Sequence, residues 1–421
     1  MSDDLGLPPR RDLPDDVRDR LRAELRRGLA KRGPSKVWYA AAAAVVLAAG
    51  ALVASQVLRP QPVAAPPPVP DPIPGDHLTL DPKVATSSLD RCWAAVRAAG
   101  KTDRVPPRED WVPLFTDVQG TDSVVAATAG GKPLFCETTE TTVTLSDPGA
   151  TPAYVPGTRT GLLLHTATGV VGGVLDPAAK GAHLDSWIEG GDSMSQTIRP
   201  SSVTGQFVGM TRSDPARTTL TVGKPMDPDQ KTLPAAPPPL VAVADRPMAA
   251  DRTSPAGRAL GDCLAAARTE VIPDAAAYSP GPLLEAGDFR VVMGRFGGQV
   301  VVCETQPDYQ RPGRTKSRAF PDFTGPKTEA ARTLTVDTLG HPESGAPPGT
   351  ARHPYVAALP TTAVEATLDF GIGTSAEVEV VDGMAAAWIP ANIALTPEAM
   401  VHVQARDAQG KVVYDGSLRL V

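Results

Sequence analysis

Aromatic residues are scarce in this sequence of 421 residues, because phenylalanine, tyrosine and tryptophan together make up only 5% of it. This scarcity argues against a carbohydrate-binding groove, which needs aromatic rings as platforms. Positive charge is not in excess either: 41 Lys+Arg stand against 47 Asp+Glu, which gives a net charge of -6. A chain with this balance is not expected to bind nucleic acid.

Recognisable catalytic motifs are also missing. The sequence contains neither G-x-S-x-G nor H-E-x-x-H. Among the six scattered histidines, His183 with Asp185 could supply two ligands to a metal ion, but no third ligand accompanies them, and the alternative is an ordinary surface role. We therefore name no catalytic residue and expect no metal and no cofactor.

One long segment lacks charge altogether. It runs from Val37 to Leu58, and a helix of 22 residues would measure roughly 33 Å, enough to cross the hydrocarbon core of a bilayer. Trp38 and Tyr39 lie at its N-terminal edge, where amphipathic rings favour the headgroup layer. The pattern predicts a transmembrane helix over residues 37–58.

The flanks of this segment predict its orientation. Residues 1–36 contain ten Lys/Arg, whereas only Arg59 lies close to the other end. The positive-inside rule then places the N-terminus in the cytoplasm and the C-terminal region outside, in the plasma membrane. A cleaved signal peptide is the alternative, since residues 53–55 could be a cleavage site.

The N-terminal segment itself has the pattern of a basic amphipathic helix over residues 13–31. Its narrow apolar stripe repeats every four residues among arginines, and this stripe could contact a cytoplasmic partner. The stripe includes Leu13, Val17, Leu21 and Leu25. The alternative is a solvated basic anchor that only fixes the topology.

Proline is concentrated in two stretches that suggest linkers. Residues 59–76 contain eight prolines, a density that favours an extended polyproline II spacer, and we place the first linker at 59–77. A second proline-rich linker is predicted at residues 224–255. The linkers delimit two exported domains, residues 78–223 and 256–421.

These two domains share an internal repeat. Residues 89–97 (LDRCWAAVR) match residues 260–268 (LGDCLAAAR), and residues 124–138 (VVAATAGGKPLFCET) match residues 291–305 (VVMGRFGGQVVVCET) without a gap. In each copy an alanine-rich helix carries one cysteine, and a hairpin with paired glycines leads to a second cysteine. We infer a duplication.

All four cysteines of the chain lie in these repeats, two in each. The economical pairing in an oxidising compartment is Cys92 with Cys136 and Cys263 with Cys303, so that each disulfide joins helix to hairpin. Zinc binding is a poorer interpretation because no C-x-x-C pair or adjacent histidine occurs. A catalytic thiol is poorer still, because nothing near these cysteines would activate it.

Strand-like sequence follows each cysteine unit. The candidate strands are residues 161–174, 218–222, 377–380, 400–406 and 411–420. Residues 170–176 loosely resemble residues 364–369, which suggests that the duplication extends through this part. We therefore predict an α+β fold: a single N-terminal transmembrane helix followed by two repeated, disulfide-stapled domains of one helix and an antiparallel sheet.

Three segments carry a resemblance of overall plan: LPDDVRDRLRAELRRGL at residues 13–29, AAAAAVVLAAGAL at 40–52 and VQARDAQGKVVYDGSLRL at 403–420. Their plan resembles uncharacterised single-pass membrane proteins of actinobacteria with a cysteine-containing ectodomain. It is loosely similar to membrane regulators that accompany sigma factors. The resemblance implies an anchored envelope protein and no particular mechanism.

The sequence thus favours a membrane-anchored, non-enzymatic binding or sensing module, displayed on a proline-rich stalk. Its expected partners are the membrane, a protein or cell-wall ligand outside, and a cytoplasmic partner for residues 1–36. The alternatives are a cell-envelope enzyme with an unrecognised site and a structural or assembly component of the envelope.

Overall fold

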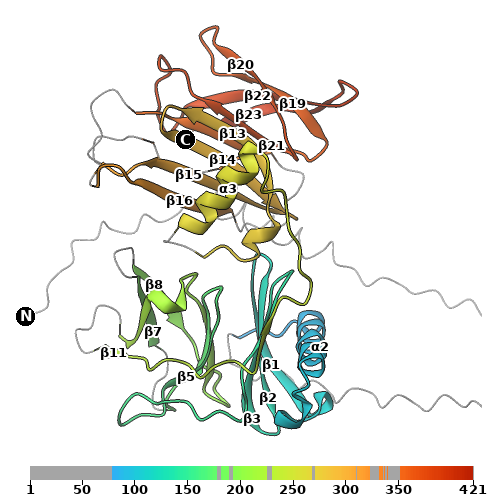
Figure 1. Ribbon diagram of the computed structural model, residues 1–421, viewed down its shortest axis with the longest axis vertical. Coiled ribbons are helices and arrows are strands. Elements are labelled where there is room, and N and C mark those ends of the chain that lie inside the picture. The colour runs from blue at the N-terminus through green and yellow to red at the C-terminus, as the bar shows by residue number, and fades with distance from the viewer. Residues whose placement is uncertain are drawn as a thin grey trace, which may run out of the picture. The chain divides into compact units, whose positions relative to one another are not determined.

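The described part of the chain forms two halves that repeat one arrangement of elements. The computed structural model describes residues 78–420 apart from 178–181, 189–192, 225–229, 268–270, 310, 323–330, 335, 337–338 and 340–350. We call residues 78–245 the first half and residues 251–420 the second half. Each half begins with one α-helix and continues with three antiparallel sheets (Figure 1).

The first half contains helix α2 and sheets A, B and C. Helix α2 spans Pro82–Ala98. Sheet A has the order β1 (Trp111–Gln119), β2 (Asp122–Ala129), β3 (Lys132–Thr138), β4 (Val143–Leu145) and β12 (Val241–Val243). Sheet B has the order β5 (Gly161–His165), β6 (Val170–Val174) and β9 (Gln206–Met210). Sheet C has the order β11 (Lys231–Thr232), β10 (Thr218–Gly223), β7 (Ala182–Ile188) and β8 (Ser193–Ile198).

The second half contains helix α3 and sheets D, E and F. Helix α3 spans Pro255–Ala266. Sheet D has the order β13 (Ser279–Ala286), β14 (Phe289–Phe296), β15 (Gln299–Pro307) and β16 (Thr315–Asp322). Sheet E has the order β17 (Arg332–Thr333), β18 (Pro354–Ala358) and β21 (Met384–Trp388). Sheet F has the order β20 (Ser375–Glu379), β19 (Ala363–Asp369), β22 (Met400–Asp407) and β23 (Val412–Arg419).

The strand order corresponds between the halves through all three sheets. Sheet B (β5-β6-β9) corresponds to sheet E (β17-β18-β21), and sheet C corresponds to sheet F read in the opposite direction. Strand β6 is therefore the counterpart of β18, since each is the middle strand of a three-stranded sheet. The predicted match of residues 170–176 with residues 364–369 is wrong, because the latter form β19 in sheet F.

Both helices begin at the same kind of signal. Asp81 caps α2 by accepting hydrogen bonds from the backbone amides of its first turn, and Ser254 caps α3 by accepting one from Gly257 at 3.0 Å. A proline occupies the first helical position in each case, where its missing N–H costs nothing.

The core of each half consists of stacked layers. In the first half, α2 packs on one face of sheet A, the other face of sheet A packs on sheet B, and sheet B packs on sheet C. Representative residues of these three interfaces are Leu89 with Val125, Phe135 with Val170, and Phe207 with Leu184. The second half repeats the stack: α3 lies on sheet D, and sheets E and F follow (Figure 1). One face of sheets C and F is left outside this stack.

The predicted α+β class is wrong, because the described structure is mostly β-sheet. Each half places its single helix at one end of the stack and builds the rest from strands. After the cysteine-bearing strands β3 and β15, the described residues form nine and eight further strands respectively, more than the few that the alternation pattern indicated. Only the sheet adjoining the helix has the helix-and-sheet arrangement that was expected.

The predicted single-pass membrane protein also requires correction. No helix in the described residues is long and apolar enough to cross a bilayer, so placement in the plasma membrane, with a cytoplasmic N-terminus and an extracytoplasmic C-terminal region, is not supported. The longer described helix, α2, has 17 residues and is amphipathic, with one face buried on sheet A. The predicted transmembrane segment 37–58, with Trp38 and Tyr39, and the stripe of Leu13, Val17, Leu21 and Leu25 lie outside the described residues.

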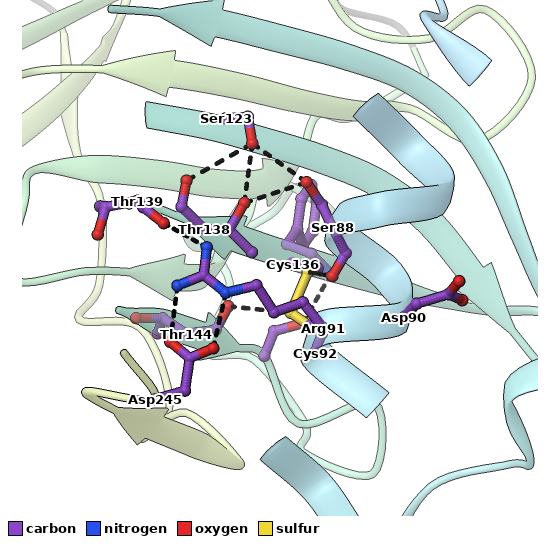
Figure 2. Close-up of a disulfide and its surroundings, with 12 residues drawn as sticks. Ser88, Asp90, Arg91, Cys92, Ser123, Cys136, Thr138, Thr139, Thr144 and Asp245 are labelled. Atoms are coloured by element: carbon purple, nitrogen blue, oxygen red, sulfur yellow. Dashed lines mark hydrogen bonds and ion pairs between the residues drawn. A yellow bond between two sulfur atoms is a disulfide. The ribbon is translucent and has the colours of Figure 1, made fainter. Parts of the chain in front are cut away.

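Both disulfides occur in the expected pairing. Cys92 on α2 is bonded to Cys136 on β3, with 6.3 Å between their Cα atoms (Figure 2). Cys263 on α3 is bonded to Cys303 on β15. Polar contacts reinforce the first disulfide. The Oγ atom of Ser88 lies 3.1 Å from that of Ser123, on β2.

Arg91, next to Cys92, connects α2 to the end of the first half. Its Nε and Nη2 atoms each donate to a different carboxylate oxygen of Asp245 at 2.7 Å, and Nη2 also donates to the Glu140 carbonyl (Figure 2). Asp245 lies in the segment predicted as a linker. This segment also supplies β11 and β12, so much of residues 224–255 belongs to the first half.

Replacing Cys92 and Cys136 together by alanine should lower the free energy of unfolding by about 4 kcal/mol. The reason is that the disulfide closes a loop of 44 residues in the unfolded chain. Urea denaturation followed by circular dichroism measures the change. The matched control is the Cys263→Ala/Cys303→Ala variant, for which a similar loss is expected. An unchanged denaturation midpoint in both variants would show that the disulfides do not stabilise the fold.

Candidate functional site

The outer face of sheet C carries the most exposed tryptophan of the described residues. On β7, Leu184 and Ser186 point into the core, so His183, Asp185 and Trp187, which alternate with them, lie on the other face, where Asp185 is buried and Trp187 is exposed. Trp187 is 53% exposed. An apolar ring of this size is thus presented to solvent on a sheet whose opposite face is fully packed.

Hydroxyl groups surround this ring on the neighbouring strands. Trp187 lies between Thr219 on β10 and Ser193 on β8, and both of these residues are exposed. The next rows repeat the pattern, with further hydroxyls beside Asp185 and His183. Their neighbours are Thr221 and Ser195 for Asp185, and Thr197 for His183. The face therefore combines one aromatic ring with a group of neighbouring hydrogen-bonding side chains.

The imidazole of His183 contacts these hydroxyl side chains. Its Nδ1 atom lies 3.4 Å from the Ser195 hydroxyl, and its Nε2 atom lies 3.2 Å from the Thr197 hydroxyl. Both ring nitrogens thus face hydroxyl groups. His183 consequently has no carboxylate partner of the kind that orients a catalytic histidine.

The carboxylate of Asp185 does not contact His183. Its carboxylate accepts a hydrogen bond from the Gln230 side chain, whose Oε1 atom accepts one from the Thr221 hydroxyl at 2.9 Å. The structure thus places His183 and Asp185 on one face but does not make them converge on a common point. Within the described ranges, no group of three potential metal ligands is found.

A second polar cluster lies inside the first half and was not predicted. Asp122, at the start of β2, is fully buried and forms an ion pair with Arg212, whose Nη1 atom lies 2.5 Å from the carboxylate. Arg212 follows β9 and has a φ of 50°, a conformation uncommon outside glycine. Its Nη2 atom also donates to the Gln119 carbonyl at 3.2 Å. This pair ties sheet A to sheet B.

Glu137 lies close to the ion pair, in the repeated C-E-T sequence. Its side chain is 1% exposed and accepts hydrogen bonds from the hydroxyls of Thr166 and Thr168. The corresponding residue of the second half, Glu304, is equally buried. The only signal for this glutamate in the sequence is that it follows the second cysteine in both repeats.

Burial dominates the protonation of this cluster. It raises the pKa of Asp122 to about 7, although Arg212 opposes the shift, and it also raises the pKa of Glu137. Burial lowers the pKa of His165 to about 4. These groups are shielded from solvent, so the cluster is suited to fixing the sheets rather than to contacting a ligand.

Comparison with models of known protein families and with curated proteins finds no match. The site must therefore be interpreted from its own residues. Of the two clusters, only the outer face of sheet C is accessible to a large ligand. Of the residues on this face, the sequence pointed to His183 and Asp185 but not to Trp187.

We expect the burial of the Asp122 carboxyl to make stability depend on pH. A folded-state pKa raised above the ordinary value of 3.8 means that the contribution of this carboxyl is complete below about pH 4 and is lost as the pH rises through 7. The stability of the native chain minus that of Asp122→Asn should therefore fall between pH 4 and pH 7. Urea denaturation of both proteins at each pH measures it.

The difference between the two proteins is the informative quantity, because His165 acts in the opposite sense. Its lowered pKa means that its contribution is lost as the pH falls from 6.5 towards 4, and it is present in both proteins. If the stability of the native chain minus that of Asp122→Asn rises with pH, Arg212 instead holds the pKa of Asp122 below its ordinary value.

Proposed function

We propose that this protein is a non-enzymatic binding protein whose first half binds a neutral, hydroxyl-rich polymer, such as a cell-wall polysaccharide, on the outer face of sheet C. The observation that carries the proposal is Trp187, an indole ring half exposed among hydroxyl side chains. Exposed aromatic rings flanked by hydrogen-bonding groups are typical of binding surfaces. The low aromatic content excludes a groove with many rings but leaves room for one platform.

The chemistry of the face suits a sugar polymer. A pyranose ring presents C–H groups that can pack on the indole of Trp187, while its hydroxyls can exchange hydrogen bonds with serine and threonine side chains. Ser193 and Thr219 flank the indole directly. Sugar hydroxyls both donate and accept, and so do the hydroxyls of this face, so ligand and face are matched in hydrogen-bonding capacity.

Charge supports a neutral ligand. The two titratable residues on β7, His183 and Asp185, already contact hydroxyl and amide groups, and the cross-strand rows 183, 185 and 187, as far as the structure describes them, carry no other charged side chain. A phosphate polymer would need several cationic side chains on such a surface.

The second half differs at the corresponding face. On sheet F, Glu365 lies directly opposite Glu379, and Thr367 lies opposite Glu377. The two halves thus share a fold but not the chemistry of their outer faces. The proposed polysaccharide site therefore belongs to the first half alone.

Replacing Trp187 by alanine should weaken binding to the polymer about tenfold or more, since each tenfold corresponds to about 1.4 kcal/mol of lost contact energy. The measurement is co-sedimentation of the full chain with insoluble peptidoglycan, cellulose and chitin, with a binding curve for each. Quenching or a blue shift of tryptophan fluorescence on binding should disappear in the variant.

Tyr154→Ala is the matched control, because Tyr154 is also a largely exposed aromatic residue of the first half but lies outside sheet C. It should bind like the native chain. Binding that survives Trp187→Ala unchanged, or no binding to any of the three polymers, would contradict the proposal.

A further inference from the structure

Arg295 is a buried cation in the second half that has no partner among the described residues. It lies on β14, and its side chain is 8% exposed. Its Nε atom is completely buried without a hydrogen-bond partner, and the described residues provide no hydrogen bond or ion pair to its guanidinium. Arg212 and Arg332, by contrast, have carboxylate partners in Asp122 and Asp322.

The position of the guanidinium is fixed by a tight turn between β20 and β21. Gly383 in this turn has a φ of 67°, and a Cβ atom there would lie 2.8 Å from Arg295 Nη1 and 2.7 Å from the Leu359 carbonyl oxygen. The guanidinium thus occupies space that any other residue at position 383 would fill. The Cα atom of Thr361 lies 3.0 Å from the same point, so the turn between β18 and β19 also borders the site.

The nearby carboxylates among the described residues form no direct ion pair with Arg295. Asp322 lies in the same cross-strand row but is bonded to Arg332 at 2.6 Å. Asp382 interacts with Arg295 through space, without a direct ion pair. Arg332 adds a second positive charge near Arg295. An arginine stays ionised even when buried, and a largely buried charge without an ion-pair partner is unfavourable, so a bound anion would stabilise this site.

We propose that Arg295 is the centre of a binding site for an oxyanion, the carboxylate or phosphate group of a ligand. A guanidinium can bind either group through two parallel hydrogen bonds. Hydroxyl donors lie close by: Ser279 is the exposed cross-strand neighbour of Arg295 on β13, and Thr361 is exposed in the bordering turn. Arginine with serine and threonine is a donor set suited to an anion.

The site belongs to the second half and is independent of the polysaccharide face. In the repeat, Arg295 aligns with Thr128, because residues 291–305 match residues 124–138 without a gap. The first half therefore has no guanidinium at this position. Failure of one proposal would leave the other unaffected.

The test is thermal unfolding and calorimetric titration of the full chain with inorganic phosphate and, separately, with succinate at equal ionic strength. Binding should raise the melting temperature, and Arg295→Met should abolish both the heat of binding and this rise. Arg295→Lys should keep weaker binding, because lysine retains the charge but not the paired donors. A response to phosphate alone, or to succinate alone, identifies which group the site takes.

Arg290→Met is the matched control, because Arg290 lies on the same strand but is half exposed and paired with Glu285. It should bind both anions like the native chain. Methionine should not impair folding at position 295, since replacing an unpaired buried charge by an apolar side chain of similar length is often stabilising. Gly383→Ala is a second variant that should weaken binding by displacing Nη1. No response of the native chain to either anion, or a response that persists in Arg295→Met, would overturn the proposal.

Discussion

The attachment of one helix to one sheet face is the constraint on which each half depends. A disulfide fixes α2 to β3 and α3 to β15, and apolar side chains fill the interface around each of them. Because the helix covers one face of its sheet, the opposite face must be covered by another layer, and that layer by a further one. The stack ends at sheets C and F, whose last face is left to solvent and is therefore free to vary.

The two halves keep some residues in common and differ in others. The interior keeps its plan, with a buried glutamate after the second cysteine in each half, Glu137 and Glu304. Polar residues differ on the outer faces and also at single buried positions of the inner strands β2 and β14. Asp122, which binds Arg212, aligns with the apolar Phe289, and Thr128 aligns with Arg295. The two halves thus share one architecture but differ in their polar residues.

The sequence predicted those features that depend on local pattern. The cysteine pairs, the hairpins at the paired glycines and the strands near residues 218–222, 377–380 and 400–420 occur in the structure, whereas residues 161–174 form two strands, β5 and β6, instead of one. The fold class was wrong because the short strands between these segments, such as β11 and β17, have only two residues each and gain their pairing from tertiary contacts.

The polar sites could not be predicted for a related reason. Asp122 and Arg212 are 90 residues apart in the chain, and no local pattern indicates that they meet. Trp187 lies in an alternating segment, but alternation does not tell which of the two faces is covered by the next layer. Only the position of sheet B against sheet C decides that His183, Asp185 and Trp187 face outward.

The contact between Arg91 and Asp245 has a consequence for how the chain can be divided. These residues are 154 positions apart, yet one lies near the start of the first half and the other at its end. β12 is the last strand in the order of sheet A. Through β12 and the ion pair of Arg91 with Asp245, the end of the first half contacts its beginning. The sequence segment that is repeated is therefore shorter than the segment that forms the complete first half. A fragment cut at the end of β10 would lack its own closing strand, whereas one cut after Asp245 would retain it.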